Sequence, residues 1–165
     1  AGLRGMRPDD ERIPDSFEIA RKMGLSYSFG IANLTSAHPN SVVLEVKGKS
    51  GRTLEVQACS LGGGRIMINR LDGLDVNCSC EIPTLIVHNL YQPGHVAEVT
   101  SMLAHKSVNI ANMSLYRDKR GGSAVMVVEM DQPLPKESLE WLEHLEGIVK
   151  VTYINVTEGE EDDVL

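Results

Sequence analysis

The sequence predicts an α+β fold, in which a helix on a mainly antiparallel sheet is followed by a βαββαβ unit of the ferredoxin-like type. Residues 41–60 alternate apolar and polar side chains around a glycine-containing turn, the pattern of a β-hairpin. Residues 84–156 show strand and helix patterns in the order βαββαβ, which places two helices on one face of a sheet. Hydrophobic residues make up 42% of the chain and aromatic residues only 4%, so an aliphatic core is expected.

The N-terminal region begins with a charged, turn-like stretch at residues 9–14. Asp15 or Ser16 is a suitable N-cap for a helix, and Gly24 is well placed to end it. Residues 25–34 have strand character, and residues 35–40 form a polar loop that contains Pro39.

The hairpin that follows is the clearest element of the first half. Val42, Leu44 and Val46 occupy alternate positions, and residues 52–60 return with the same alternation. Three glycines at 62–64 interrupt the pattern before a further strand at 65–69, which the Asp-Gly turn at 72–73 closes. Residues 74–81 are expected to be a connector.

The second half repeats short elements separated by Gly and Pro. Strands are predicted at 84–89, 109–117, 123–130 and 148–156, with helices at 95–106 and between Pro135 and Gly147. We predict that His95, His105 and His144 lie on helix surfaces. The acidic residues 158–165 are expected to form a solvated tail.

Composition limits the partners of the chain. A net charge of −7 disfavours nucleic acid and anionic membrane surfaces, and no apolar run is long enough to span a bilayer. An odd count of cysteines (Cys59, Cys78 and Cys80) without a secretory signal indicates reduced thiols in the cytoplasm. The Cys78-Ser79-Cys80 stretch lacks the ligand number of a metal site, so small buried thiols are expected and no metal is assigned to this chain.

Three stretches of the second half resemble the ACT domain, a small-ligand regulatory module. They are PTLIVHNLYQPG at 83–94, VNIA at 108–111 and GIVKV at 147–151. The resemblance implies an amino-acid effector held between the loop before the first helix of one module and the Asn-Ile strand of a neighbouring one. Carried over to this sequence, it implicates Asn89, Tyr91, Gly94 and Asn109.

The residues themselves suit such a ligand. Gly94 permits close approach to backbone amides, the following helix N-terminus favours a carboxylate, and Asn109 can donate and accept hydrogen bonds. Related modules often carry Asp or Asn where Tyr91 stands, which leaves the partner of the ligand's amino group open. The alternative is that Pro93-Gly94 is only a loop-to-helix junction and Asn109 a turn residue.

The first half resembles the beta chain of iron–sulfur L-serine dehydratases through HPNSV at 38–42 and SLGGG at 60–64. The resemblance implies an allosteric-substrate-binding-type domain at 1–80, partial here, before an ACT domain at 81–157. The Ser-Ser-Ser-His-Thr-Ala-Gly stretch with which that family usually starts is missing, so about the first third of the natural subunit is expected to be absent.

This resemblance also implies partners and a cofactor. A partner alpha chain would hold a [4Fe-4S] cluster, act on the substrate hydroxyl with iron as a Lewis acid, and deaminate L-serine to pyruvate and ammonia. This chain would be a regulatory and structural subunit that is inactive alone. ACT modules commonly pair side by side, so a homo-oligomer through these domains is expected as well.

Two groups in the first half have open roles. His38 can exchange protons near neutral pH, and the resemblance places the matching His-x-Asn motif near the active site, with Asn40 shaping the loop. The alternative is an exposed loop histidine beside a turn-forming Asn. Gly62, Gly63 and Gly64 could cradle an anion with Arg65 and Lys47, although a bulge or tight bend is favoured.

Two other functions remain. The chain could be the C-terminal regulatory region of a phosphoglycerate dehydrogenase, which resembles the same pairing of domains, or a stand-alone amino-acid-binding ACT protein. The His-Pro-Asn and triple-glycine motifs favour the dehydratase.

Overall fold

The protein is described by a computed structural model that covers residues 1–7, 9–35 and 37–155. The described residues form two compact units, the first at 1–7 and 9–35 and the second at 37–155. Within the described residues, no helix is long and apolar enough to cross a membrane. The acidic tail at 158–165 and the last two residues of the expected 81–157 domain lie outside the described residues.

The first unit holds two short 3-10 helices, Gly2–Arg4 and Ile13–Asp15, and the helix α1, Ser16–Lys22. Gly24 has a φ of 74° and ends the helix as expected, because its left-handed conformation turns the chain away. The expected strand at 25–34 is wrong: these residues form neither helix nor strand and pair with no strand that the structure describes. Phe17, Tyr27 and Phe29 form a ring cluster there, with centroids 5.2–6.0 Å apart.

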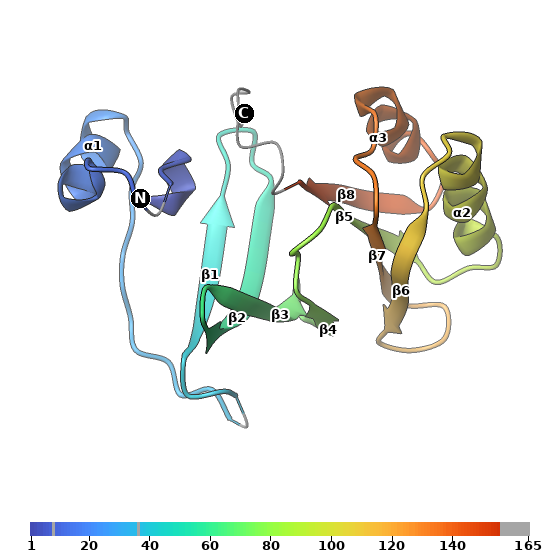
Figure 1. The fold of residues 1–165 in the computed structure, drawn as a ribbon. Coiled ribbons are helices and arrows are strands. Elements are labelled where there is room, and N and C mark those ends of the chain that lie inside the picture. Colours follow the sequence, from blue (N-terminus) through green and yellow to red (C-terminus); the bar gives the residue numbers. More distant parts are fainter. Residues whose placement is uncertain (8, 36, 156–165) are drawn as a thin grey trace. The chain divides into compact units, whose positions relative to one another are not determined.

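The second unit begins with a four-stranded antiparallel meander, β1 Ser41–Lys47, β2 Thr53–Gly62, β3 Arg65–Leu71 and β4 Leu74–Cys78 (Figure 1). The hairpin prediction is confirmed, with Val42 opposite Ala58 and Leu44 opposite Val56. Strand β4 corrects the connector expected at 74–81. Asp72 and Gly73 have φ values of 45° and 83°, the left-handed pair that a tight hairpin turn requires.

The rest of the second unit has the predicted order βαββαβ. Its elements are β5 Thr84–Leu90, α2 His95–His105, β6 Ile110–Arg117, β7 Ser123–Met130, α3 Lys136–Glu143 and β8 Ile148–Ile154. The strands form one antiparallel sheet in the order β6-β7-β5-β8. Figure 1 shows α2 and α3 on the same side of this sheet.

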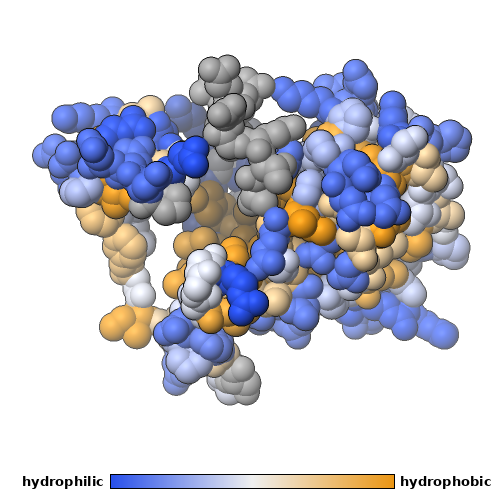
Figure 2. Space-filling view, in the orientation of Figure 1, coloured by the Kyte–Doolittle hydropathy of each residue, from blue (hydrophilic) through white to orange (hydrophobic). Residues whose placement is uncertain are grey.

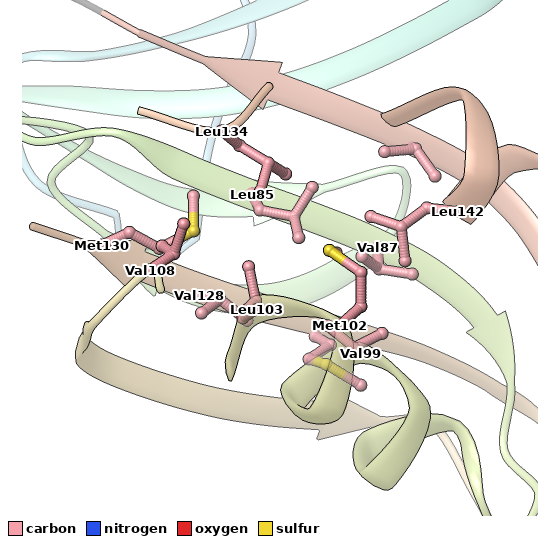
Figure 3. Close-up of a cluster of buried hydrophobic side chains, with 12 residues drawn as sticks. Leu85, Val87, Val99, Met102, Leu103, Val108, Val128, Met130, Leu134 and Leu142 are labelled. Carbon is pink, nitrogen blue, oxygen red and sulfur yellow. The ribbon is translucent and has the colours of Figure 1, made fainter. Parts of the chain in front are cut away.

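The central strands β5 and β7 are buried on both faces. On one face, side chains of these strands meet those of α2 and α3, as Figure 3 shows for Leu85, Val87, Leu103 and Leu142. On the other face, a second cluster joins them to the β1–β4 sheet. Its buried members are Ile68, Leu71, Val76, Cys78, Cys80, Ile86, Val125 and Val127.

This double burial bears on the domain division. A strand covered on both faces has a continuous apolar run rather than an alternating one, as at 85–87 and 124–128. Residues on both sides of the expected boundary at 80/81 share the second cluster and belong to one compact unit. The assignment of 1–80 and 81–157 to separate domains therefore stays a prediction. So does the packing of α1 on a sheet, because α1 and the β1–β4 sheet belong to different units.

Candidate functional site

The loop between β5 and α2 provides the first half of the predicted effector site. Gly94 is the N-cap residue of α2, with φ 111° and ψ −40°, and no described side chain caps this helix end. Space around the missing side chain of Gly94 is open. The first amide groups of α2 therefore lack a side-chain acceptor, which is the usual anion-binding feature of a helix N-terminus.

Asn89 and Tyr91 lie at the same end of β5. Asn89 is 3% exposed, its Nδ2 donates to the carbonyl of Leu90 at 2.8 Å, and its buried Oδ1 has no partner among the described residues. The guanidinium of Arg117 lies 4.6 Å above the ring of Tyr91. The structure thus brings Asn89, Tyr91 and Gly94 to one end of the sheet.

Asn109 lies at the other end. Its backbone amide donates to Gln132 Oε1 at 2.7 Å, its side chain donates to Asp131, and it precedes the start of β6. Strands β5 and β6 both pair antiparallel with β7, which lies between them, so they run in the same direction and begin at the same end of the sheet. The seven residues of β5 span about 20 Å at the usual rise of a strand. One chain cannot therefore bring Asn109 and Gly94 to the same small ligand.

His95 corrects the expectation that it lies on the helix surface. It is 7% exposed, its Nδ1 lies 3.3 Å from Glu98 Oε2, and its buried Nε2 has no described partner. The ring covers Gly147, where a side chain would lie 2.6 Å from Nε2. The helical spacing of the sequence could not predict that His95 is buried. Its ring packs on Gly147, which lies 52 residues later in the sequence. His105 and His144 are exposed, as expected.

The loop residues of the first half gather at one end of the β1–β4 sheet. His38 is exposed, and its Nδ1 accepts a hydrogen bond from the backbone amide of Asn40 at 3.2 Å. The backbone amide of Ser60 donates to the carbonyl of Asn40 at 3.0 Å, which brings this loop beside the strand end that leads into the triple glycine. Neutral His38 thus carries its proton on Nε2.

The three glycines form the tight β2–β3 turn. Gly62, Gly63 and Gly64 have φ values of 84°, 62° and 78°, and nothing lies within 4 Å of where their side chains would be. Glycine is therefore explained at these positions by the left-handed backbone of a tight turn. Close approach of a neighbouring strand is not the reason. Lys47 pairs with Thr53 at the opposite end of β1, so the expectation that it lies near Arg65 is wrong.

A polar cluster that the sequence did not reveal joins the two sheets. Lys150 Nζ donates to Asp72 Oδ2 at 2.6 Å and to the carbonyl of Thr53 at 3.0 Å, while His88 Nε2 lies 3.6 Å from Asp72 Oδ2. The guanidinium of Arg52 also donates to the carbonyl of Val151. Burial opposes ionisation of Asp72, but the hydrogen bonds from Lys150 and from the Glu55 amide outweigh it and lower the pKa of Asp72. Burial lowers the pKa of His88, against the charge of Asp72.

The helices also leave a groove on their outer side. It has a volume of about 630 Å³ and lies between α2 and α3, with Met102 and Trp141 among its lining residues. Hydrophobic patches emerge between hydrophilic ones over these helices (Figure 2). The lining of the groove mixes these apolar side chains with charged ones such as Glu98, Lys106 and Glu137, but it contains no residue of the predicted effector site, so the β5–α2 loop remains the candidate site.

Comparison with known proteins gives two relatives that match nearly the whole chain. The probable L-serine dehydratase beta chain of Bacillus subtilis is 32% identical over 153 residues, which are 93% of this chain and 69% of that protein. The L-serine dehydratase beta chain of Peptoniphilus asaccharolyticus is 31% identical over 94% of this chain and 70% of that protein. The D-3-phosphoglycerate dehydrogenase of Methanocaldococcus jannaschii is 30% identical over 54% of this chain and 17% of that protein. No family model matches the chain.

Proposed function

Because the chain belongs to the family of L-serine dehydratase beta chains, we propose that it is the regulatory and structural subunit of an L-serine ammonia-lyase. That enzyme would convert L-serine to pyruvate and ammonia together with an alpha chain, and this chain alone would be inactive. The observation that carries the proposal is the extent of the match, 93% and 94% of the chain. It includes both the β1–β4 sheet and the βαββαβ unit.

We assign the cluster of the complex to the alpha chain. Within residues 1–7, 9–35 and 37–155, no three His, Cys, Asp or Glu side chains are grouped to hold a metal ion. Cys78 and Cys80 are neighbours, but four thiolates usually hold a [4Fe-4S] cluster. The described residues of this chain do not fit the cluster. Free cysteines are also the normal state in the cytoplasm, where we place the complex.

The βαββαβ unit is proposed to be an ACT domain that senses an amino acid. The open N-terminus of α2 would receive the carboxylate, and the unpartnered Oδ1 of Asn89 is a suitable acceptor for the ammonium group. Tyr91, which already holds Arg117 over its ring, would close the loop side of the site.

A second copy of the chain would supply Asn109. Its distance from Gly94 within one chain supports a site shared between two copies, in which each loop faces the partner's β6 strand. Among the described strands, β6 pairs only with β7. Its outer edge is therefore available for contact with a second copy of the chain. The homo-oligomer through these units is thus part of the same proposal.

His38 is proposed to act at the interface with the alpha chain. The side chain of His38 is exposed, and its Nδ1 accepts a hydrogen bond from the Asn40 amide. This bond leaves Nε2 as the ring nitrogen that can meet a substrate or a partner chain. There it would position substrate or relay a proton in the active site of the complex. The neighbouring triple-glycine turn and Arg65 would add anion contacts at the same end of the sheet.

Reconstitution tests this function. The complete subunit and its alpha chain are combined without oxygen, and pyruvate release from L-serine is measured. We expect activity from the pair and none from this chain alone. In the pair, His38→Ala should lower turnover at least tenfold, as loss of a proton-transfer group does. His105→Ala, an exposed histidine on α2, is the matched control and should keep full activity.

Two outcomes would contradict the proposal. Absence of pyruvate from the intact, cluster-loaded pair would remove the dehydratase function. Equal turnover of His38→Ala and the control would remove His38 from the mechanism but leave the subunit assignment standing.

A second candidate is the regulatory region of a phosphoglycerate dehydrogenase. The D-3-phosphoglycerate dehydrogenase of Bacillus subtilis is 24% identical over 84% of this chain, although the match covers only 26% of that protein. This function requires a nucleotide-binding domain in the same natural protein. Nicotinamide-dependent oxidation of 3-phosphoglycerate by the natural protein would favour it over the dehydratase.

A further inference from the structure

Two buried thiols lie in contact where the two sheets of the second unit meet. Cys78 is the last residue of β4, Cys80 is two positions further on, and their Sγ atoms are 3.0 Å apart. The residues are 2% and 7% exposed. A separation of 3.0 Å is less than the sum of two sulfur radii and about 1 Å longer than a disulfide bond.

The backbone holds the two sulfurs together. Cys80 has a φ of 53°, a left-handed conformation that is uncommon for a residue with a side chain. In a regular strand, residues two apart would keep their side chains parallel and separated. The turn at Cys80 instead folds its thiol back toward Cys78. The left-handed backbone at Cys80 thus contributes to the contact between the two sulfurs.

The pair belongs to the apolar second cluster, and three polar side chains, Ser79, Glu129 and Asn112, lie on one side of it. Glu129 Oε1 accepts a hydrogen bond from Ser79 Oγ at 3.2 Å and lies 4.0 Å from Cys78 Sγ, while Asn112 Nδ2 donates to Glu129 Oε2 at 2.9 Å. The proposed function does not use this cluster.

We propose that Cys78 and Cys80 are a modification site at which a peroxide closes a reversible disulfide across Ser79. The Cys78 thiolate attacks one peroxide oxygen, which forms a sulfenic acid and releases hydroxide. The Cys80 sulfur then attacks Cys78 Sγ, and the sulfenic oxygen leaves as water with the proton of the Cys80 thiol. The hydroxide of the first step becomes the other water when it takes up the proton that Cys78 released on ionising. Two thiols and one hydrogen peroxide thus give one disulfide and two waters, and two electrons pass from the sulfurs to the peroxide. A small dithiol reverses the step by thiol–disulfide exchange.

The two cysteines have different roles in this reaction. Hydrogen bonding from Cys80 is the main cause that lowers the pKa of Cys78, against burial and the charge of Glu129. The same hydrogen bond, together with burial, raises the pKa of Cys80. These opposite directions, together with the contact between the two sulfurs, support an attack by the Cys78 thiolate with Cys80 as the resolving thiol.

The site predicts a local product that peptide mass spectrometry can identify. The full 165-residue chain is treated with hydrogen peroxide, free thiols are alkylated after denaturation, and the chain is cut with trypsin. Cys78 and Cys80 fall in the peptide 71–106, whereas Cys59 falls in the peptide 53–65. We expect the peptide 71–106 to lose both alkylation sites and the mass of two hydrogen atoms, and to regain them after dithiol treatment. The peptide 53–65 should remain alkylated.

Three variants sharpen the result. Cys80→Ser should abolish the closed form and leave the oxidation on Cys78. Cys59→Ser, which removes another buried thiol, is the matched control and should leave closure unchanged. Glu129→Gln should speed closure a few-fold, because it removes a negative charge beside the thiolate.

Equal oxidation of both peptides, a cross-link between chains, or sulfinic acid on Cys78 beside a free Cys80 would overturn the proposal. These outcomes are read on the wild-type chain, so they count even where a variant fails to fold.

Discussion

The two sheets of the second unit differ in how their apolar side chains are covered. Strands β5 and β7 have helices on one face and the β1–β4 sheet on the other, and Leu85 is fully buried. In the β1–β2 hairpin, Leu44 is 44% exposed although it alternates as a core residue would. The same residue type in the same kind of element thus contributes to a core in one sheet and to a surface in the other. Burial depends on what covers a strand, not on its pattern alone.

The largest expected effect contrasts these two leucines. Leu85→Ala should lower the free energy of unfolding by about 4 kcal/mol, because it leaves a cavity in a face that helices enclose. Leu44→Ala should cost less than about 1 kcal/mol, since its site is already half in water. Urea unfolding followed by circular dichroism measures both. Comparable losses would show that the hairpin face is covered in solution.

The next effect compares substitutions at two glycines. Gly147→Ala should lower the free energy of unfolding by about 3 kcal/mol, because the residue has a φ of 82° and its new side chain would collide with the ring of His95. Gly63→Ala has a similar φ of 62° but open space, so it should cost only about 1 kcal/mol. Thermal unfolding distinguishes them. If the additional His95→Ala substitution recovers no stability in the Gly147 variant, the contact with the imidazole ring is not the cause.

The polar cluster between the sheets should make stability depend on pH. Burial lowers the pKa of His88 below its usual 6.5. His88 therefore binds a proton more readily in the unfolded chain than in the folded chain. Stability is therefore complete above about pH 7 and decreases as the pH falls through the window below 6.5. The lowered pKa of Asp72 has the same sign at still lower pH, because protonation weakens its contact with Lys150.

This effect is smaller than the first two and can be isolated by substitution. Urea midpoints at about pH 7.5 and about pH 5.5 bracket the ordinary titration of histidine. The wild type should lose stability between these conditions, and His88→Gln should lose less. A variant with the same decrease as the wild type would exclude His88 as the source.

Local signals were sufficient to predict most elements. The alternation at 41–60 and the glycine and proline boundaries of the second half predicted the hairpin and the βαββαβ order, because such signals act over a few residues. Strand β4 was missed although Asp72-Gly73 indicated a hairpin, since the return strand is only five residues long. The strand expected at 25–34 failed because strand character needs a pairing partner, which a sequence pattern does not supply.

The candidate sites show where sequence information ends. The sequence places Asn89, Tyr91 and Gly94 close together along the chain, so their common position at one end of the sheet follows directly, whereas their role in binding comes from the ACT resemblance and stays a prediction. Motif spacing could not show that Asn109 lies at the far end of the sheet, that His95 covers Gly147, or that Lys150 meets Asp72, since these contacts join residues far apart in the chain. Long-range pairing of this kind follows from strand order and sheet stacking rather than from local pattern.

Complementation between two defective variants tests the shared effector site most directly. L-serine is used as the probe amino acid, and calorimetry should detect its binding to the wild type. Gly94→Val should disable the loop and Asn109→Ala the facing strand, so neither variant alone should bind it. Mixed dimers have one site with both defects and one with neither, so mixing the variants should restore binding to part of the chains. Unchanged binding by Asn109→Ala, or no recovery on mixing well-folded variants, would contradict a site built from two copies.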